Sequence, residues 1–387
     1  MAVRRTGLVR ARKAAGFTQE TFAEAAGVDR SAVARWETGV REPSPHLRWK
    51  LAKLLRVSLD RLDELITEGA PDRGAPSERL AHVLLHPTSA DLVAVAELRQ
   101  QVYELDERYD RAPSTSLLAE TGQTLGRITF LSAHATHRVR RELSAVEAQC
   151  AILMGQLVWD ASQRRDHRTA HMYFDQAGAA AKRVRDSATE GLALLRKSYV
   201  ALYGQKDPRT GLSLTTRAAD VTAQTSQVLS GLATLHAAEA HAMMGRQADC
   251  EAALTEAGSH FDRIDDDDAA LGLFSPTQQG RLAGSCYLFL GEPRRAEHIL
   301  EATSAQLRNR SKSEAILLGN LSLARLRQGK VDEAAGALHQ AMDVIELTWG
   351  GGGLNILFDA CREMQPWRQQ PEVQDVYDRM MSLMATR

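Results

Sequence analysis

The sequence predicts an all-α protein in two parts, a compact five-helix head at residues 1–66 and a solenoid of stacked helical pairs at residues 145–387. Apolar residues recur at spacings of three and four along much of the chain, which is the period of one helix face. Aromatic residues make up only 5% of the 387 residues, while alanine and leucine are abundant, and this balance favours helix over strand. Three segments in the second half align on a glycine, as repeated helical hairpins do.

The two parts differ in charge. Residues 1–66 carry 13 Lys and Arg against 8 Asp and Glu, a net charge of +5, and the remaining residues carry 35 against 41, a net charge of −6. A basic head on an acidic body is expected where the head alone binds DNA. The same distribution argues against a body that wraps around DNA.

Targeting segments and paired cysteines are not evident in the sequence. The basic N-terminus lacks the apolar run of a signal peptide, and no window approaches the roughly 18 apolar residues of a membrane-spanning helix. The cysteines are widely separated and lack CxxC spacing, which predicts reduced thiols in a cytoplasm rather than disulfides or a zinc site. They are Cys150, Cys250, Cys286 and Cys361. We expect Cys250 and Cys286 to be core residues, with redox sensing as the alternative.

The most informative stretch is Thr18–Pro43, TQETFAEAAGVDRSAVARWETGVREP, which predicts two short helices joined by a tight turn. Thr18 is a favourable N-cap for a first helix over Gln19–Ala26, although Thr21 is not expected to complete a capping box. Gly27 can adopt the left-handed conformation that such a turn requires.

The second helix of this stretch is predicted to begin near Asp29 or Arg30 and to end at a Gly39 cap. Val33 and Trp36 lie three residues apart, so they share its buried face. The other side of the helix, near its N-terminal end, is the part of a recognition helix that meets base edges.

The pattern TQ-x2-x-A-x3-G-V-x4-V-x2-WE-x-G-x-R-x-P resembles the Xre-type helix-turn-helix domain that lambdoid phage repressors share, over roughly the first 66 residues. By this resemblance Thr18 and Gln19 would touch phosphate, and Arg41 would lie near the DNA backbone. The residues that would face bases are Arg30, Ser31, Ala32 and Arg35. The alternative is a helical hairpin that only packs.

Other helices are predicted on both sides of this stretch. The head is completed by helices at about Leu8–Ala15 and Pro45–Leu55 and by a short last helix capped by Ser58. Residues 67–77 are polar and rich in Gly and Pro, which predicts a linker. Residues 78–144 are predicted to be a helical connecting region, with helices at Glu78–Leu85, about Ser89–Tyr109 and Leu117–Leu131. The apolar stripe of the middle helix would form a bundle or a dimer seam, and a bundle is the simpler expectation.

Self-similar segments are found from about residue 145 onward. In three of them a helix is expected to end at a glycine, with a small residue seven positions earlier, another five positions later and a leucine four beyond that. The residues in this order are Ala238, Gly245, Cys250 and Leu254; Gly284, Gly291, Ala296 and Leu300; and Ser322, Gly329, Ala334 and Leu338. Small residues at these positions would let two antiparallel helices approach closely.

This pattern resembles tetratricopeptide repeats, most clearly in LRQGKVDEAAGALHQAM. Two weaker copies precede the three clear ones, at Ala151–Gly178 and from about Glu190 to a turn at Gly204. Each repeat would bury its apolar side only against its neighbours, so five copies predict a curved α-solenoid with a concave face. A capping helix is expected at Pro371–Thr386.

No pattern predicts a catalytic site, a metal site or a cofactor. The acidic run Asp265–Asp268 lacks the spacing of a calcium loop, so a solvated loop is expected there. The stretch Trp349–Gly353 lacks the lysine of a phosphate loop, so a flexible connector is expected. Histidine pairs at helical spacing have no further ligand at a fitting offset. These pairs are His82 with His86, His134 with His137, and His167 with His171.

The concave face of the solenoid is the remaining candidate site, because the first helix of each such repeat lines the groove. Counting from the glycines, the predicted effector-binding positions are Trp159, Gln163, His236, Glu239, Gln278, Arg281, Ser285 and Asn320. Amide and charged side chains at these positions would hold an extended peptide backbone, and the tryptophan would offer an apolar wall. The alternative is a groove that holds only water or the protein's own helices.

Together the two parts resemble the Xre-plus-repeat regulators of actinomycetes, including the YLFLGEPRRAE region, and more distantly the peptide-responsive quorum-sensing regulators of Gram-positive bacteria. This resemblance implies a regulator. We expect it to bind a double-stranded DNA operator as a homodimer, since a single head contacts few bases, and to sense a peptide or small-molecule effector in its repeat groove. The sequence patterns predict neither an enzyme activity nor membrane attachment. A protein-interaction adaptor that uses the repeat groove without selective DNA binding is the alternative.

Overall fold

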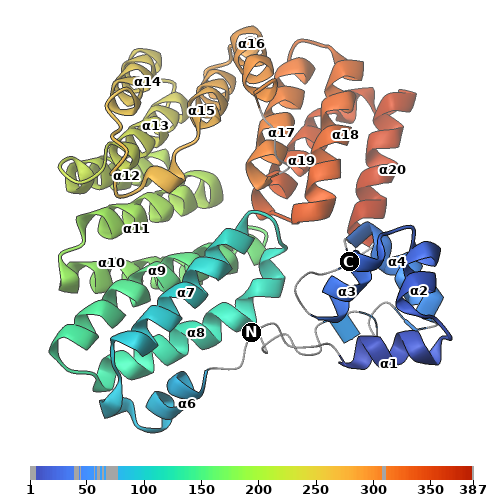
Figure 1. Ribbon diagram of the computed structural model, residues 1–387. Coiled ribbons are helices and arrows are strands. Elements are labelled where there is room, and N and C mark those ends of the chain that lie inside the picture. The colour runs from blue at the N-terminus through green and yellow to red at the C-terminus, as the bar shows by residue number, and fades with distance from the viewer. Residues whose placement is uncertain are drawn as a thin grey trace. The chain divides into compact units, whose positions relative to one another are not determined.

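A computed structural model describes residues 6–38, 43, 45–55, 57–58, 62, 65–66, 77–306 and 311–385. The chain divides into two compact units, Met1–Glu78 and Arg79–Arg387. The regular elements that the structure describes are all helical (Figure 1), which confirms the predicted all-α fold class. Below, the first unit is called the head and the second the repeat unit.

The head contains helices α1 (Thr6–Ala14), α2 (Gln19–Ala26), α3 (Arg30–Glu37) and α4 (Pro45–Leu55). They pack around one apolar core, which includes the side chains of Leu8, Phe22, Val33, Trp36 and Leu51. The predicted fifth helix falls largely outside the described residues. Its described members Leu62, Leu65 and Ile66 are helical and buried in the same core.

The turn between α2 and α3 forms as predicted, with one difference at the start of α2. Gly27 ends α2 in the left-handed conformation, with φ of 78°, and Lys50 Nζ donates a hydrogen bond of 3.0 Å to the carbonyl of Ala26. The expectation that Thr21 does not complete a capping box is wrong. The Thr21 hydroxyl accepts from the amide of Thr18 at 2.9 Å while the Thr18 hydroxyl accepts from the amide of Thr21 at 3.2 Å. A threonine hydroxyl thus does at this position what glutamate or glutamine usually does.

The repeat unit begins with helices that precede the repeats. They are α6 (Glu78–Leu85), α7 (Leu92–Tyr109) and α8 (Ser114–His134), with a short 3-10 turn at Pro87–Ser89. The apolar stripe of α7 is buried against α8 and α9 through Val95, Leu98, Val102 and Leu105, so it forms a bundle within the chain rather than a free seam.

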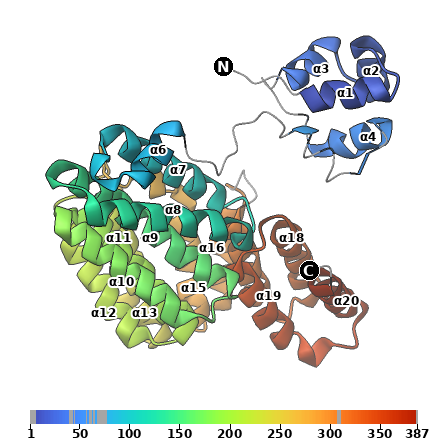
Figure 2. The same ribbon diagram turned by 90° about the horizontal axis from the view of Figure 1, so that it is seen from below.

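Five antiparallel helical pairs follow in the described part of the chain. They are α9 (His137–Ala161) with α10 (His167–Val184), α11 (Ser187–Tyr199) with α12 (Pro208–Thr222), α13 (Gln227–Met243) with α14 (Gln247–Phe261), α15 (Pro276–Phe289) with α16 (Pro293–Ser304), and α17 (Lys312–Leu326) with α18 (Val331–Thr348). After them α19 (Gly351–Glu363) packs mainly against α17, and α20 (Pro371–Ala385) packs against α18. Each first helix contacts the first helix of the next pair, and Figures 1 and 2 show the pairs stacked in chain order. The predicted α-solenoid is therefore confirmed.

The repeat positions read from the sequence meet one another in the structure. Gly245, Gly291 and Gly329 all adopt the left-handed conformation, with φ of 72° to 76°. A Cβ at Gly284 would lie 2.5 Å from Leu300, and Ser322 Oγ donates a hydrogen bond of 2.9 Å to the carbonyl of Ala334. The small residues thus stand where the two helices of a pair approach most closely.

Two predicted glycine roles in the repeat unit are wrong. Gly204 does not make the turn of its repeat, because α11 continues into a π-helical segment, Val200–Gln205, and Lys206 takes the left-handed conformation instead. A Cβ at Gly204 would lie 2.5 Å from His167 Nε2, so this glycine permits a close approach. Gly351–Gly353 are not a flexible connector but the buried first turn of α19.

Candidate functional site

The exposed face of α3 is the candidate DNA-binding surface. Val33 and Trp36 of this helix are buried in the head core, whereas Arg30, Ser31 and Arg35 are exposed on it. Arg30 Nε lies 2.6 Å from Glu20 Oε1 of α2, and both side chains are more than half exposed. Arg35 Nη2 donates to Ser31 Oγ at 3.3 Å. These polar contacts lie at the surface, so the groups remain available to exchange them for contacts with DNA.

The other residues that the sequence associates with DNA have mixed placements. Thr18 is exposed at the N-terminus of α2, and Ala32 is half-buried against the head core. The amide of Gln19 is half-buried and donates a hydrogen bond of 2.6 Å to Glu37 Oε2. Arg41 lies outside the described residues.

Glu37 also binds a buried arginine, a contact that sequence reasoning missed. Arg12 Nε lies 2.6 Å from Glu37 Oε1, and both side chains are almost fully buried. Arg12 Nη1 donates a further bond of 2.7 Å to the carbonyl of Phe17. The glutamate of the WE motif thus holds α1, α2 and α3 together, which fixes how α3 is presented.

The repeat unit encloses a cavity of about 1110 Å³ along the inner side of its first helices. Of the eight effector positions predicted from the sequence, seven line this cavity: Trp159, His236, Glu239, Gln278, Arg281, Ser285 and Asn320. The eighth, Gln163, does not line it, because the chain leaves α9 at Ala161 and Gln163 adopts a left-handed conformation in the following turn. Gln163 lies four residues after Trp159 and would share its helix face only if α9 continued past Ala161.

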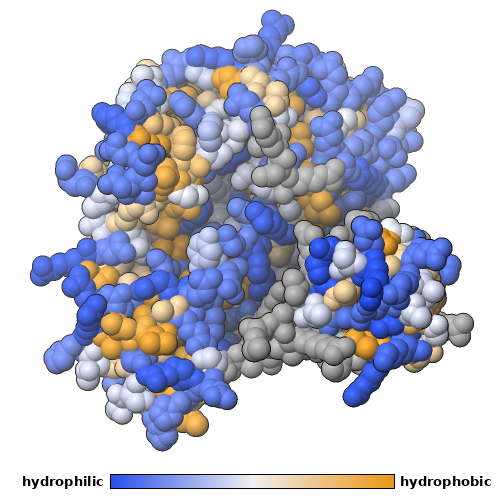
Figure 3. Space-filling view, in the orientation of Figure 1, coloured by the Kyte–Doolittle hydropathy of each residue, from blue (hydrophilic) through white to orange (hydrophobic). Residues whose placement is uncertain are grey.

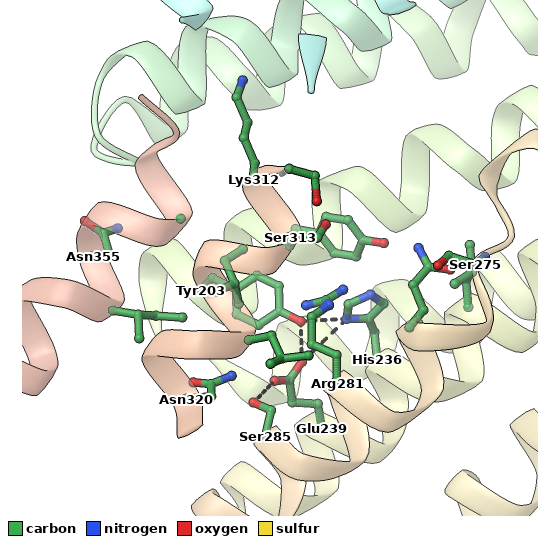
Figure 4. A pocket seen from close by; sticks show the side chains of 18 of the residues that line it. Tyr203, His236, Glu239, Ser275, Arg281, Ser285, Lys312, Ser313, Asn320 and Asn355 are labelled. Atoms are coloured by element: carbon green, nitrogen blue, oxygen red, sulfur yellow. Dashed lines mark hydrogen bonds and ion pairs between the residues drawn. The ribbon is translucent and has the colours of Figure 1, made fainter. Parts of the chain in front are cut away.

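A hydrogen-bonded network crosses the cavity wall between three elements, the π-helical segment after α11, α13 and α15 (Figure 4). Tyr203 Oη donates to Glu239 Oε2, and Ser285 Oγ donates to Glu239 Oε1 at 2.5 Å. Tyr203 Oη also lies 2.6 Å from His236 Nδ1. Because the hydroxyl proton is directed to the carboxylate, the Nδ1–H of a neutral His236 must be the donor to the tyrosine oxygen.

Burial controls the charges of this network. Burial lowers the pKa of His236, while bonding to Glu239 acts in the opposite direction and only partly offsets it. Burial acts to raise the pKa of Glu239, but the nearby His236 ring, with Nδ1 3.5 Å from Glu239 Oε2, and the hydrogen bonds from Ser285 and Tyr203 together hold this pKa below its ordinary value. Burial and the neighbouring carboxylate raise the pKa of Tyr203 well above its ordinary value. The network therefore holds an ionised glutamate beside a neutral histidine.

Aromatic and arginine side chains form the adjoining wall. The rings of Tyr199 and His236 lie 4.3 Å apart, and the guanidinium of Arg196 lies 5.3 Å from the ring of Tyr199. The guanidinium of Arg164 lies 4.6 Å from the ring of Trp159 and 5.9 Å from that of Tyr203. Sequence reasoning missed Tyr199, Tyr203 and Arg196. Tyr199 lies three residues after Arg196 and four before Tyr203, a spacing that puts all three on one helix face.

A buried contact joins the two ends of the repeat unit beside the cavity. Lys312 Nζ at the start of α17 lies 3.2 Å from Asp160 Oδ2 near the end of α9. It also donates to Ser114 Oγ at 2.9 Å, and the amide of Gly351 donates to Asp160 Oδ1 at 3.0 Å. A Cβ at Gly351 would lie 2.9 Å from the carbonyl oxygen of Asp160, so only glycine permits this approach. The contact closes the cavity between α9 and α19.

The remaining patterns have structural roles. Asp268 of the acidic run accepts hydrogen bonds from Ser226 Oγ at 2.6 Å and from the amide of Val228 at 3.2 Å, which secures the start of α13. All four cysteines are buried as free thiols. Within the described residues, no group of three or more potential metal ligands comes together.

None of the described helices combines the length and the apolar composition needed to span a bilayer. On the face shown in Figure 3, hydrophilic residues predominate and smaller hydrophobic areas lie between them.

Known proteins match the chain in part. Residues 8–62 match a family model described as helix-turn-helix. No curated protein matches the sequence. Among solved structures, a crystal structure of Rap protein complexed with competence and sporulation factor is 13% identical, with 76% of this chain and 98% of that chain covered and a TM-score of 0.43. The crystal structure of Bacillus thuringiensis PlcR in complex with the peptide PapR7 and DNA is 14% identical, with 68% and 95% covered and a TM-score of 0.30. The family match and the fold together identify the chain as an all-α protein with a helix-turn-helix head followed by tetratricopeptide-like helical repeats.

Proposed function

We propose that this chain is a sequence-specific DNA-binding transcriptional regulator that acts as a homodimer and whose repeat unit binds an effector. The observation that carries the proposal is that one side of α3 is buried and apolar while the other is exposed and basic. Val33 and Trp36 anchor the helix in the core, while Arg30, Ser31 and Arg35 remain exposed. An exposed helix face of this kind, within a helix-turn-helix domain, is suited to enter the major groove.

Two heads are needed for useful affinity. A single helix-turn-helix domain reaches few bases, whereas two domains on a two-fold site read two half-sites about one helical turn apart. The head supplies the positive charge that attracts phosphate, and the acidic remainder of the chain does not compete for DNA. We therefore expect a palindromic operator and a dimeric protein.

The cavity of the repeat unit is the proposed effector site, with a peptide or a small molecule as its ligand. Its volume of about 1110 Å³ reaches beyond the usual range for drug-sized ligands, about 300–1,000 Å³. Seven predicted residues line it: Trp159, His236, Glu239, Gln278, Arg281, Ser285 and Asn320. An effector changes DNA binding only if it favours one arrangement of the dimer over another.

The test is a selection of bound fragments from a random DNA pool by the purified full chain at about 0.15 M salt. We expect a two-fold motif for the wild type and a weaker, less selective motif for Arg30→Ala and for Arg35→Ala. Lys53→Ala is the matched control, because it removes one exposed positive charge of the head from α4 rather than from α3. Equal footprints for the wild type and both arginine variants would contradict the role of α3. A stoichiometric protein partner together with no selected motif would support an adaptor instead.

A further inference from the structure

Three arginine guanidinium groups lie beside a cluster of three aromatic rings inside the cavity. We define the arginine–aromatic cluster as Arg164, Arg196, Tyr199, Tyr203, His236 and Arg281, all of which line the cavity. Arg164 lies over Tyr203 and Arg196 over Tyr199, and Arg281 lies beside His236 and Tyr203 (Figure 4). Guanidinium groups that converge in this way repel one another unless an anion stands between them.

The protein's own carboxylates are engaged elsewhere and pair only weakly with these arginines in the described part of the chain. Asp160 is bound by Lys312 and by the amide of Gly351, and its distance of 3.9 Å from Arg164 Nε is too long for a hydrogen bond. Glu239 accepts hydrogen bonds from Tyr203 and Ser285. Within the described residues, Arg196 and Arg281 form no ion pair, although Asp106 also lines the cavity and the charge of Arg196 acts to lower the pKa of this carboxyl against the rise that burial causes.

The buried side-chain atoms of the lining that lack a hydrogen-bond partner are all donors. They are Trp159 Nε1, Arg164 Nε and Arg196 Nε. Trp159 is only 5% exposed, so its N–H has little access to bulk water. A buried donor without an acceptor is costly, and an acceptor-rich ligand would remove this cost for several groups at once.

We propose that the arginine–aromatic cluster is the subsite for an anionic group of the effector, a carboxylate or a phosphate, that is joined to an apolar body. This inference rests on the proposed effector role of the cavity and names the class of ligand. Arginine forks bind carboxylate and phosphate oxygens in pairs, and the rings of Tyr199, Tyr203 and Trp159 offer faces for the apolar body. The anion is either the C-terminal carboxylate of a peptide or the acid group of a small molecule.

The test compares two fluorescent probes on the full chain. Anilinonaphthalene sulfonate carries an anionic group on an aromatic body, and phenyl-naphthylamine has a similar body without the charge. We expect the wild type to bind the anionic probe at least about tenfold more tightly than the neutral one, because hydrogen bonds to charged groups are the strong ones. Arg196→Met and Arg281→Met should abolish this preference while leaving binding of the neutral probe within about twofold.

Two further variants make the result specific. Arg327→Met removes a cavity-lining arginine that is already paired with Glu363 at 2.7 Å, so it should keep the preference for the anionic probe. Arg196→Lys retains the charge and should retain part of the preference. Thermal unfolding of each variant identifies any that fail to fold, and the lysine variant then decides the result.

The outcomes are separable. Equal affinities of the wild type for the two probes, or an unchanged preference in both methionine variants, would overturn the anion subsite while leaving the DNA selection untouched. Displacement of the anionic probe by short apolar peptides with a free C-terminus, but not by the same peptides amidated, would support a peptide source. Displacement by naphthoate but not by naphthamide would support a small organic acid. Equal displacement by the charged and the neutral member of both pairs would count against the subsite.

Discussion

Lys312 Nζ lies 3.2 Å from Asp160 Oδ2, and this contact joins the last repeats of the chain to the first. Ser114 is linked to Lys312 across 198 residues of sequence, and Gly351 to Asp160 across 191. Burial lowers the pKa of Lys312, whereas the charge of Asp160 acts to raise it. A buried ion pair therefore closes the curved solenoid, and in it the charges of Lys312 and Asp160 compensate each other.

Removal of the lysine should open this closure. Lys312→Ala leaves the buried carboxylate of Asp160 without its charge partner, and breaking a buried pair in this way typically costs about 3–5 kcal/mol. We expect a matching decrease in the free energy of unfolding of the repeat unit, measured by urea titration of the full chain. Arg99→Ala breaks an exposed ion pair with Glu142 in the same unit and should cause only a small change. Similar effects of the two substitutions would show that the closure does not stabilise the unit.

The first turn of α19 should reject a side chain. In Gly351→Ala the added Cβ would lie 2.9 Å from the backbone oxygen of Asp160, which cannot move aside as a side chain can. We expect a loss of about 1–3 kcal/mol in unfolding free energy, as for other overpacked sites. Gly336→Ala is the control, since a Cβ there meets nothing within 4 Å on an exposed face of α18. That substitution should stabilise the helix by about 0.5–1 kcal/mol.

Lowering the pH should decrease the unfolding free energy of the repeat unit, because His236 is buried there. Its pKa is lowered from 6.5 in the folded state, mainly by burial. Above pH 6.5 the histidine is neutral in both states and its contribution is fully present. As the pH falls below 6.5 the unfolded chain binds the proton first, so stability is lost until the folded state is protonated too. Glu239, whose pKa is lowered from 4.5, acts in the same direction at lower pH.

The check is the unfolding midpoint measured from about pH 7 to pH 5. The wild type should lose stability over this interval, and His236→Gln should lose less. Part of the slope will remain, because burial also lowers the pKa of His171, His241 and His260. His298→Gln alters an exposed histidine and should leave the slope as in the wild type. A slope unchanged by His236→Gln would contradict the assignment.

Replacing the exposed arginines of α3 should weaken DNA binding, by an amount that depends on whether each arginine contacts a base or a phosphate. Arg30→Ala and Arg35→Ala should each weaken binding to the selected operator by about 1–3 kcal/mol per lost base contact, and relax base preference at the contacted position. A phosphate contact would instead weaken binding to all sequences alike and reduce the salt dependence. Titration of the operator and of a scrambled duplex at two salt concentrations separates the two roles.

The carboxylate of Glu37 should be needed for the head to fold. Glu37→Ala leaves the guanidinium of Arg12 buried without its partner and removes the acceptor of the Gln19 amide. We expect a loss of about 3–5 kcal/mol in the stability of the head, seen as a lower unfolding transition and a loss of operator binding. Glu24→Ala, an exposed change in α2, should leave both unaltered. Normal melting of the Glu37 variant would exclude a structural role for this carboxylate.

The sequence by itself determined the helices and their pairing. Gly27, Gly245, Gly291 and Gly329 end their helices in the left-handed conformation as predicted, because a cap depends on residues within a few positions of one another. The spacing of side chains along a helix face is also local, and it correctly placed Val33 and Trp36 in the core with Arg30 and Arg35 exposed on α3. Counting from the repeat glycines also selected seven residues of the cavity lining, since side chains on one face of successive first helices share one side of a solenoid.

Only the tertiary structure decided which of these side chains meet. Lys312 and Asp160 meet and close the cavity because the small rotations between successive repeats add up to a curved solenoid. The sequence of a single repeat does not determine this total curvature. The role of Gly351 follows from a segment 191 residues away, so the local sequence predicts only a flexible connector there. The placement of Tyr203 next to His236 and Glu239 likewise depends on how two helices from successive repeats pack together. Contacts within a helix are fixed by local spacing, whereas contacts across the cavity are fixed by how the helices stack.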